Sequence, residues 1–366
     1  MPSVGLTVNA GSSSVKLRLI GNDNSVLRSA DVAFDPTAGS VTKIVDSLRS
    51  FGTADIVAHR VVHGGVDFRH ATLIDADVVG ALRRLTPLAP LHQHSALQLI
   101  AAVGAERPAT PSVGCFDTSF HSTMPAAAAT YAVPASWRTR FGARRYGFHG
   151  LSHDQASRRA CEIAGRQLDA TRVVVCHLGA GASVCAVLNG GSVDTSMGFT
   201  PLDGLVMATR SGAVDPGLVL WLIEHAGLTP NAVRHALEHE SGLLALAGTA
   251  DMRLITEGVS AGDAGCVAAL DVYVHRLRSE IGSMAAAMNG IDVLAFTGGV
   301  GEHSPEVRRR TCLGLAHLGV TVDDAANDRS TGDSTISADD GGAACVVVTA
   351  REDLSMARAA RACLSR

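Results

Sequence analysis

Two segments far apart in the chain share a strand–turn–strand pattern, and this pattern restricts the fold more than any other feature. Residues 4–20 combine a strand, the turn NAGSSS and a second strand, and residues 173–189 combine VVVCH, the turn LGAGA and SVCAVLN. Aligning the two turns requires a shift of one residue. If the similarity reflects duplication, the chain holds two related halves. Each half then opens with a hairpin whose small turn residues direct backbone N–H groups toward one point, which suits phosphate.

The rest of the chain alternates between predicted strands and predicted helices, as expected of an α/β protein. At roughly 150 residues per domain, a length of 366 residues predicts about two domains. Strands are expected at 25–34, 55–62, 111–117, 172–178, 183–189, 292–297 and 344–349, and helices at 40–51, 92–104, 152–165, 216–226, 230–240, 264–289, 305–316 and 352–364.

Local signals predict where two of the helices begin. Ser152 followed by Gln155 resembles a capping box. Ser304, followed by a proline and an acidic residue, predicts an N-cap. The polar segment 323–343 is rich in Gly, Asp and Ser, and it predicts a surface loop.

Composition excludes several classes of protein and partner. Hydrophobic residues make up 46% of the chain and charged residues 18%, which argues against disorder and against a coiled coil. The formal net charge of −4 gives no electrostatic reason to expect nucleic acid or an anionic membrane as partner. The first residues lack the pattern of a signal peptide. Asn289, Gly290 and Asp292 interrupt the most apolar late stretch, which argues against a membrane-spanning helix there. The eight cysteines form no C-x-x-C pair, so we expect a cytoplasmic protein.

Three glycine-rich or serine-rich turns follow predicted strands and could hold phosphate. They are Asn9–Ser14, Gly179–Ser183 and Gly298–Gly301, and the third one opens a helix. None is a Walker A loop, and none completes the G-x-G-x-x-G pattern. The chain has only two lysines, Lys16 and Lys43, and Lys16 directly follows the first of these turns.

Seven histidines in four stretches leave two interpretations open. The pairs His59/His63 and His149/His153 have the i,i+4 spacing that could chelate zinc on a helix. However, the first pair lies in a predicted strand and turn, where the side chains would be about 13 Å apart. The second pair spans a turn into a helix. Hydrogen-bonded core positions are the competing interpretation.

Segment 193–216 is long, mostly uncharged and rich in turns, which is typical of a functional loop. Arg210 at its exposed end suits either an anion clamp or a surface ion pair. Residues 258–262 match the nucleophile-elbow pattern G-x-S-x-G, but no buried strand precedes them. We therefore do not expect a serine hydrolase.

Together, the motifs resemble those of the acetate kinases, from Gly5 to the C-terminal helix and in the same order. The chain is shorter than is typical of that family, mostly between Lys16 and His59. The motifs are NAGSSSVK, HRVVHGG, APLHQ, FDTSFHSTMP, RRYGFHGLSH, HLGAGAS, VDTSMGFTPLDGLVMATRSGAVDP, ESGLL, FTGGVGEHS and TAREDL.

The resemblance implies a duplicated actin-like (ribonuclease H-like) ATPase fold of the α/β class. The first domain would comprise 1–119 plus 351–366. The second, 120–350, would carry the nucleotide-binding turns and the interface of a homodimer. ATP would lie in a cleft between the domains. The implied reaction is the reversible transfer of the ATP γ-phosphoryl group to acetate, giving acetyl phosphate and ADP.

The resemblance also assigns catalytic roles. Arg60 matches the arginine that grips the substrate carboxylate, and Arg210 the one that reaches the transferred phosphoryl group. His149 matches the histidine that supports the equatorial oxygens, and Asp117 the acid that helps place Mg²⁺ or its water. The metal, Mg²⁺ with Mn²⁺ as an alternative, would be held by Asn9 and Glu352. Further positions on the phosphate side or close to the substrate are Ser12, Ser14, Lys16 and His92.

Nucleotide and carboxylate contacts complete the implied site. The nucleotide-binding residues would be His177, Leu178, Gly179, Ala180, Gly181, Asp251, Met252, Arg253, Gly299, Val300, Gly301, Glu302 and His303. The walls of the carboxylate pocket would be Val62, Leu91, Phe148 and Pro201. Val62 would set the size of the substrate. Because one methylene is worth only ~1–3 kcal/mol of discrimination, we expect a preference for acetate with some turnover of propionate.

Three residues depart from the family pattern. Ala180 replaces an asparagine, Ala208 a glycine and His303 an asparagine. A lost hydrogen bond to a charged group costs roughly 1.5–3 kcal/mol, which would raise KM for ATP without abolishing activity. The alternatives are a propionate or other short-chain carboxylate kinase and, in another class, a nucleotide-binding regulatory protein with little turnover.

Overall fold

A computed structural model describes residues 4–11, 14–34, 38–338 and 342–365, without the side chains of Ala38, Pro90 and Leu91. The chain divides into two compact units. The first contains Met1–Ser122, Phe148–Gln155 and Arg351–Arg366, and the second contains Thr123–Gly147 and Ala156–Ala350. These units differ from the predicted domains mainly in segment 148–155, which the prediction places in the second domain. No described helix is both long and apolar enough to cross a membrane.

The first unit is built on a six-stranded mixed sheet in the order β3-β2-β1-β4-β6-β5. Strands β1, β4 and β6 are parallel to one another, whereas β2, β3 and β5 run antiparallel to their neighbours. The strands are β1 (Gly5–Ala10), β2 (Ser14–Ile20), β3 (Val26–Ala33), β4 (Ile56–Val61), β5 (Thr72–Leu73) and β6 (Ser112–Phe116).

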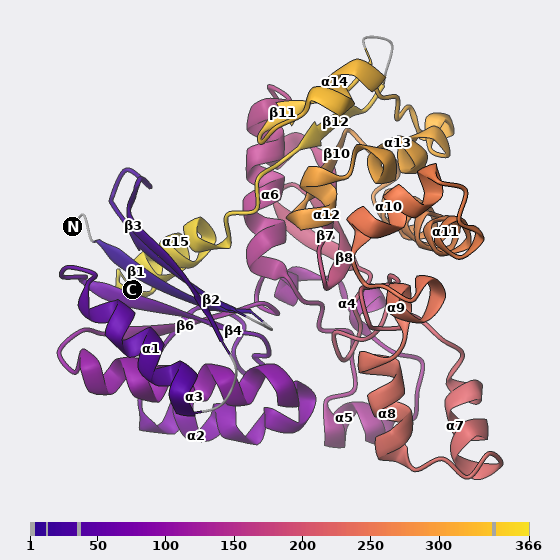
Figure 1. The fold of residues 1–366 in the computed structure, drawn as a ribbon. Coiled ribbons are helices and arrows are strands. Elements are labelled where there is room, and N and C mark those ends of the chain that lie inside the picture. The colour runs from indigo at the N-terminus through magenta and orange to yellow at the C-terminus, as the bar shows by residue number, and fades with distance from the viewer. Residues whose placement is uncertain (1–3, 12–13, 35–37, 339–341, 366) are drawn as a thin grey trace. The chain divides into compact units, whose positions relative to one another are not determined.

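Helices cover both faces of this sheet, which agrees with the burial of every residue of β1 (Figure 1). On one face Val57 packs with Leu99 and Val103 of α3. On the other, its neighbour Ile56 packs with Met356 of α15, because successive strand residues point to opposite faces. The helices of this unit are α1 (Ala38–Arg49), α2 (Ala76–Arg84), α3 (Pro90–Glu106) and α15 (Glu352–Leu364).

The second unit repeats the arrangement of the first sheet strand by strand. Its sheet has the order β9-β8-β7-β10-β12-β11 when read from β9. Strands β7, β10 and β12 are parallel, and the other three run antiparallel to their neighbours. The strands are β7 (Arg172–Leu178), β8 (Ala182–Leu188), β9 (Gly191–Thr195), β10 (Val293–Thr297), β11 (Ser334–Thr335) and β12 (Ala344–Val347). The matching order confirms the duplicated α/β fold, with β1 and β2 corresponding to β7 and β8.

The long helix α11 packs on the second sheet through buried residues such as Leu270 and Leu277. Helix α6 begins in segment Phe148–Gln155 of the first unit and ends in the second unit. The other helices are α4 (Ala126–Ala129), α5 (Ala135–Phe141), α6 (Gly150–Ile163), α7 (Pro216–Glu224), α8 (Pro230–His239), α9 (Gly242–Ala247), α10 (Met252–Ser260), α11 (Ala264–Ala287), α12 (Gly298–His303), α13 (Pro305–Leu313) and α14 (Asp324–Arg329).

Local predictions were partly confirmed. Ser304 is the N-cap of α13 and accepts a hydrogen bond from the Val307 amide at 3.4 Å. The predicted capping box at Ser152 is wrong, because α6 already begins at Gly150. The predicted loop at 323–343 is wrong in part, because it contains α14 and β11. Residues 339–341 of that segment lie outside the described part of the chain.

Candidate functional site

Three polar side chains of the first unit meet at one edge of its sheet. Asn9 lies near the end of β1, Arg60 near the end of β4, and Asp117 directly after β6. Because these strands are parallel neighbours, their carboxyl ends lie side by side, where α/β proteins commonly bind ligands. The sheet topology therefore gathers residues that are far apart in the sequence.

Hydrogen bonds join these side chains into one cluster with Glu352, the first residue of α15. The Arg60 guanidinium donates to Asp117 Oδ2 at 2.7 Å from Nη2, and to Asp117 Oδ1 at 3.0 Å from Nε. Its Nη1 donates to Asn9 Oδ1 at 3.2 Å. Asn9 Nδ2 in turn donates to Glu352 Oε2 at 3.3 Å.

The electrostatics of this cluster favour a charged Arg60. Burial opposes the charge on its guanidinium, but the Asp117 and Glu352 carboxylates outweigh that effect and raise the pKa of Arg60. The Asp117 side chain is 1% exposed and that of Arg60 15% exposed. A buried arginine–carboxylate pair of this kind fixes the direction of the remaining guanidinium N–H groups.

The oxygen donors of this cluster fit Mg²⁺ better than zinc. They are the Asn9 amide oxygen and the Asp117 and Glu352 carboxylates. Among the described residues, no three or more His, Cys, Asp or Glu side chains are grouped so that they could hold a metal ion by themselves. Mg²⁺ usually takes one or two carboxylates together with substrate phosphates and water, so an incomplete protein shell of oxygens suits it.

The backbone around His149 is held next to Asp117. His149 adopts a left-handed conformation with φ of +57°, which is uncommon for a residue with a side chain. The Gly150 amide donates to the Asp117 carbonyl at 2.9 Å, and a Cβ at position 150 would overlap that carbonyl. The His121 ring Nε2 lies 2.9 Å from the Phe148 carbonyl oxygen. These contacts place His149 beside the Arg60 cluster within the first unit.

Residues predicted to wall the carboxylate pocket have different environments. Val62 is buried, and Phe148 is buried with its ring edge against His63 at a centroid distance of 5.3 Å. His92 is half-buried near the start of α3. Pro201 belongs to the second unit. The side chain of Leu91 lies outside the described residues.

The first hairpin turn is described only in part. Ser12 lies outside the described residues, whereas Ser14 is half-buried at the start of β2 and its carbonyl accepts the Gly11 amide at 2.8 Å. Lys16 is exposed on β2 and lies opposite Asn9 in the strand register. The lysine singled out from the sequence is thus next to the Arg60 cluster.

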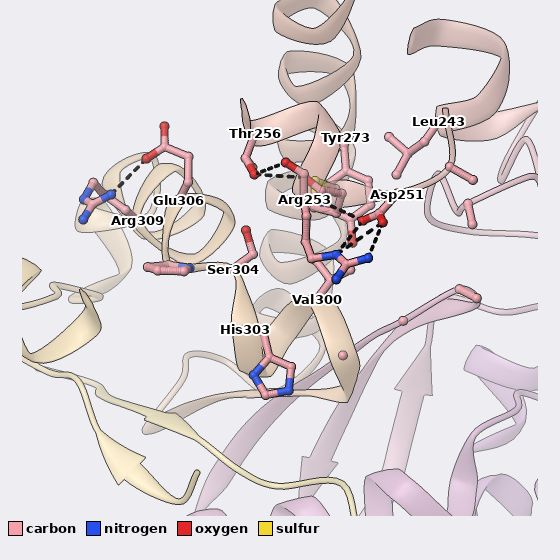
Figure 2. A pocket seen from close by; sticks show the side chains of 17 residues that line it. Leu243, Asp251, Arg253, Thr256, Tyr273, Val300, His303, Ser304, Glu306 and Arg309 are labelled. Carbon is pink, nitrogen blue, oxygen red and sulfur yellow. Dashed lines mark hydrogen bonds and ion pairs between the residues drawn. The ribbon is translucent and has the colours of Figure 1, made fainter. Parts of the chain in front are cut away.

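The second unit contains a cavity of about 600 Å³ that brings the predicted nucleotide-binding stretches together. Gly179 and Ala180 reach it from the turn after β7, Asp251 to Arg253 from the start of α10, and Gly299, Val300 and His303 from α12 (Figure 2). Most of these residues are far apart in the sequence. Their convergence on one cavity is what a single bound molecule would require.

Five predicted nucleotide-binding residues do not line this cavity. His177 and Leu178 are the last residues of β7, and Gly181 forms a backbone bond with Gly179 at 3.0 Å. Gly301 is a buried residue of α12 itself. The Glu302 carboxylate accepts the Gly298 amide at 3.1 Å and the Ala350 amide at 3.0 Å, so it holds the backbone of α12.

The sequence reasoning missed other residues that line the cavity. All three departures from the family pattern, Ala180, Ala208 and His303, line it, and the Ala208 amide donates to the Ala180 carbonyl at 3.2 Å. Cavity residues that were not predicted are Leu243, Ala250, Thr256, Tyr273, Ser304, Pro305, Glu306 and Arg309. Glu306 and Arg309 form an ion pair at 2.9 Å, away from the Asp251–Arg253 pair (Figure 2). The sequence signals in this group were the motif ESGLL, which contains Leu243, and the N-cap pattern at Ser304.

The Asp251–Arg253 pair shapes the start of α10. Asp251 is the N-cap residue, and its side chain accepts the Arg253 amide at 2.9 Å. The Arg253 guanidinium donates to the same carboxylate at 2.6 Å. These bonds lower the pKa of Asp251 to about 2, so the carboxylate is ionised at neutral pH.

Arg210 is half-buried and has no carboxylate partner among the described residues. Its Nη1 donates to the Pro201 carbonyl at 2.8 Å and contacts Met207 Sδ at 3.6 Å. Burial lowers the pKa of Arg210, and Glu238 partly opposes this shift. The structure thus corrects the prediction of an exposed position and favours the anion clamp over a surface ion pair. A partly desolvated guanidinium without a counter-ion attracts anions strongly.

The alternative sites considered from the sequence have structural explanations. His59, His63, His121 and His153 are all buried, which supports core positions for these four histidines. The G-x-S-x-G segment lies on α10 and its end, and the Ser260 hydroxyl donates to the Thr256 carbonyl at 3.0 Å. A helix in place of a strand rules out a nucleophile elbow there.

Comparisons with known proteins agree with this geometry. The model of the Acetokinase family matches residues 22–358. The acetate kinase of Thermosipho africanus is 39% identical, over 96% of this chain and 96% of that protein. The solved acetate kinase of Porphyromonas gingivalis has a TM-score of 0.89 and 34% identity, covering 99% of this chain and 100% of that one.

A propionate kinase from Francisella tularensis is similar to the same degree. Its TM-score is 0.90 at 32% identity, covering 98% of this chain and 99% of that one. The family match, the relatives over nearly the full length and the duplicated sheets agree. The chain therefore belongs to the acetokinase family and is a phosphotransferase whose acceptor is a carboxyl group.

Proposed function

We propose that this protein catalyses the reversible, Mg²⁺-dependent transfer of the ATP γ-phosphoryl group to acetate. The observation that carries the proposal is the cluster of Asn9, Arg60, Asp117 and Glu352 at the carboxyl edge of the first sheet. It combines a cation for a carboxylate substrate with oxygen donors for a divalent metal. The cavity of the second unit, with a volume of about 600 Å³, supports a nucleotide as the second substrate.

Arg60 is proposed to bind the substrate carboxylate. A guanidinium carries five N–H groups, and bonds to Asp117 and Asn9 occupy its Nε and one N–H on each Nη. Two N–H groups therefore remain to donate to a carboxylate, and Asp117 fixes their direction. The acceptor is already an anion, so the reaction needs charge neutralisation and positioning more than a base.

Arg210 and His149 are proposed to stabilise the transferred phosphoryl group. Arg210 supplies a guanidinium whose described partners are neutral. His149 supplies an imidazole on a backbone fastened to Asp117. Mg²⁺, when bound through Asp117, Asn9 and Glu352 together with phosphates and water, neutralises phosphate charge.

The decisive experiment is an assay that traps acetyl phosphate as its hydroxamate in the presence of ATP, Mg²⁺ and acetate. Product formation supports the proposal. ATP binding by calorimetry without any acyl phosphate would instead support a regulatory nucleotide-binding protein. No product and no ATP binding would reject both proposals.

Propionate kinase activity is the second candidate, because the propionate kinase of Francisella tularensis is as similar in structure as the acetate kinase. The buried Val62 is proposed to limit the size of the acyl group. One methylene changes discrimination by ~1–3 kcal/mol. The ratio of kcat/KM for acetate, propionate and butyrate decides between the candidates, and a ratio that favours propionate would replace acetate as the substrate.

We propose that the protein is a homodimer that uses α7. The helix sequence PGLVLWLIE is strongly apolar, yet Leu218, Leu220 and Trp221 are 47%, 57% and 54% exposed. Contiguous exposed apolar residues of this kind mark an interaction surface. A Leu220→Glu variant should sediment as a monomer where the natural protein sediments as a dimer. A Val26→Glu variant, at an exposed apolar residue of β3, is the control.

A cytoplasmic location is also proposed. All eight cysteines are free thiols, and seven of them are buried. Free thiols of this number persist in reducing compartments. Fractionation of cells that express the tagged protein tests this location, and recovery in a secreted or membrane fraction would contradict it.

A further inference from the structure

Arg308 on α13 is a fully buried guanidinium that donates to the backbone of α12. Its side chain is 1% exposed. Its Nη1 donates to the carbonyls of Gly301 and Glu302, each at 2.8 Å. On its other side, Nε and Nη2 donate to Asn327 Oδ1 at 2.7 Å and to the Asn327 carbonyl at 2.8 Å. Arg308 thus joins α12, α13 and α14.

The charge on this buried side chain has no acidic partner. No ion pair of Arg308 occurs within the described part of the chain, and its four acceptors are neutral oxygens. Burial lowers the pKa of Arg308 to about 10, so the guanidinium remains charged at neutral pH. An apolar side chain in place of Arg308 could fill the space, but it would leave these four oxygens without their donor. The guanidinium therefore matters for the groups that it holds and not for packing alone.

The carbonyls that Arg308 binds belong to a helix that forms part of the cavity wall. Gly299, Val300 and His303 of α12 line the cavity, whereas Gly301 and Glu302 of the same helix do not. The N-terminal end of α12 is held separately, because the Glu302 carboxylate accepts the Gly298 amide. Arg308 and Glu302 together hold both ends of α12 from the side away from the cavity.

We propose that Arg308 is a positioning residue for the nucleotide, which sets the backbone of α12 against a ligand in the cavity. This inference rests on the proposed function, because it takes the cavity to be the ATP site. Arg308 would act without touching ATP, by preventing the carbonyls of Gly301 and Glu302 from rotating. Loss of these bonds would let Gly299 and Val300 shift relative to the ligand.

The test compares two Arg→Lys variants, one at the arginine that holds α12 and one at an arginine that holds a different helix. Arg308→Lys removes the guanidinium whose Nη1 holds the two carbonyls of α12 while its Nε and Nη2 hold Asn327. Arg278→Lys is the matched control, because Arg278 also donates to two backbone carbonyls, those of Arg310 and Thr311 on the same helix α13. Neither of these carbonyls belongs to α12.

Because a hydrogen bond from a charged group contributes roughly 1.5–3 kcal/mol, Arg308→Lys should weaken ATP binding in calorimetry by about tenfold or more. KM for ATP should rise in parallel, while kcat and KM for acetate stay within about threefold. Arg278→Lys should lower the thermal midpoint but leave ATP affinity within about twofold. Unchanged ATP affinity in Arg308→Lys, or an equal loss in both variants, would overturn the proposal.

A milder variant covers the case in which Arg308→Lys does not fold. Asn327→Ala removes the side-chain acceptor of Arg308 Nε and leaves the arginine in place, so ATP affinity should fall by about threefold. If that affinity does not change, Arg308 is not a positioning residue. The calorimetric readout does not depend on turnover. If the protein without substitutions binds ATP but forms no acyl phosphate, the proposed function is rejected. The effect of the Arg308 variants on ATP affinity can still be measured in that case.

Discussion

At the scale of single residues, the two candidate anion-binding arginines are prepared in different ways. Arg60 is oriented by a buried carboxylate, which raises its pKa and directs its remaining donors. Arg210 is oriented by the neutral carbonyl of Pro201, and burial lowers its pKa. The paired Arg60 presents a rigidly oriented guanidinium, which suits the single negative charge of the proposed carboxylate substrate. The second arrangement, at Arg210, leaves the guanidinium without a carboxylate hydrogen-bond partner among the described residues, which suits its proposed role toward a phosphoryl group.

Arg210 should therefore matter more for catalysis than for folding. Arg210→Ala is expected to lower kcat by about 10³-fold, as for other arginines that neutralise a transferred phosphoryl group. Steady-state kinetics with both substrates measures this effect. Arg234→Ala is the control, because Arg234 is exposed on α8 and bonds only Asn231 among the described residues. A loss below about tenfold in Arg210→Ala would show that its charge is not used in the chemical step.

At the scale of elements, the carboxyl ends of parallel strands organise both halves of the molecule. Asn9, Arg60 and Asp117 lie at the ends of three neighbouring strands of the first sheet. The turn after β7 and helix α12, which directly follows β10, reach the cavity of the second unit. Two buried histidines lie close to the ends of the strands of the first sheet. His59 is on β4, and His121 is in a short 3-10 helix that follows β6.

These buried histidines should make the protein sensitive to acid. Burial lowers the pKa of His59 and of His121 to about 4, from an ordinary value of 6.5. As the pH falls from 6.5 toward 4, the unfolded chain takes up protons that the folded chain refuses, so stability decreases. The slope is about 1.4 kcal/mol per pH unit for each histidine. Above this window the full stability is retained.

Urea unfolding at about pH 7 and about pH 5 measures this slope. The His121→Gln variant keeps a donor for the Phe148 carbonyl and removes one titrating group. In this variant, the part of the pH dependence of the free energy of unfolding that the two histidines cause should fall by about half. An unaltered slope in this variant would show that His121 accepts a proton in the folded protein.

At the scale of the whole molecule, two units with the same strand order carry different chemistry. The first presents carboxylates and a guanidinium at its sheet edge, whereas the second presents small residues around a cavity. Duplication thus supplied one framework, and different side chains at equivalent strand ends created two kinds of site. Metal dependence belongs to this scale, because the metal is proposed to bind to the first unit and the nucleotide to the second.

Removal of divalent metal should abolish activity without unfolding the protein. The Asp117 carboxylate is already compensated by Arg60 at 2.7 Å, so the first unit does not need a cation to keep this charge buried. Dialysis against EDTA is expected to stop acetyl phosphate formation while the circular dichroism spectrum and thermal midpoint are retained. Added Mg²⁺ should restore turnover. Loss of the folded signal on chelation would reveal a structural metal that the described residues do not suggest.

Much of the fold and part of the candidate site could be predicted from sequence. Most of the strands and the longer helices were predicted, because apolar runs and glycine turns are local signals. The start of α6 was misplaced, since Ser152 mimics a cap while Gly150 actually opens the helix against Asp117. Helix α10 was missed although its sequence is amphipathic. Strand β9 was missed because it is a short edge strand that its pairing with β8 decides.

The amino-acid sequence by itself determined the α/β class, the family and the identity of the residues proposed to act, because motifs and hydrophobic periodicity are local properties of the chain. Only the tertiary structure decided that Arg60 pairs with Asp117, that three distant stretches share a cavity, and that Arg308 holds α12. Such contacts depend on strand order and burial. A buried charge finds its partner only after the sheets have formed.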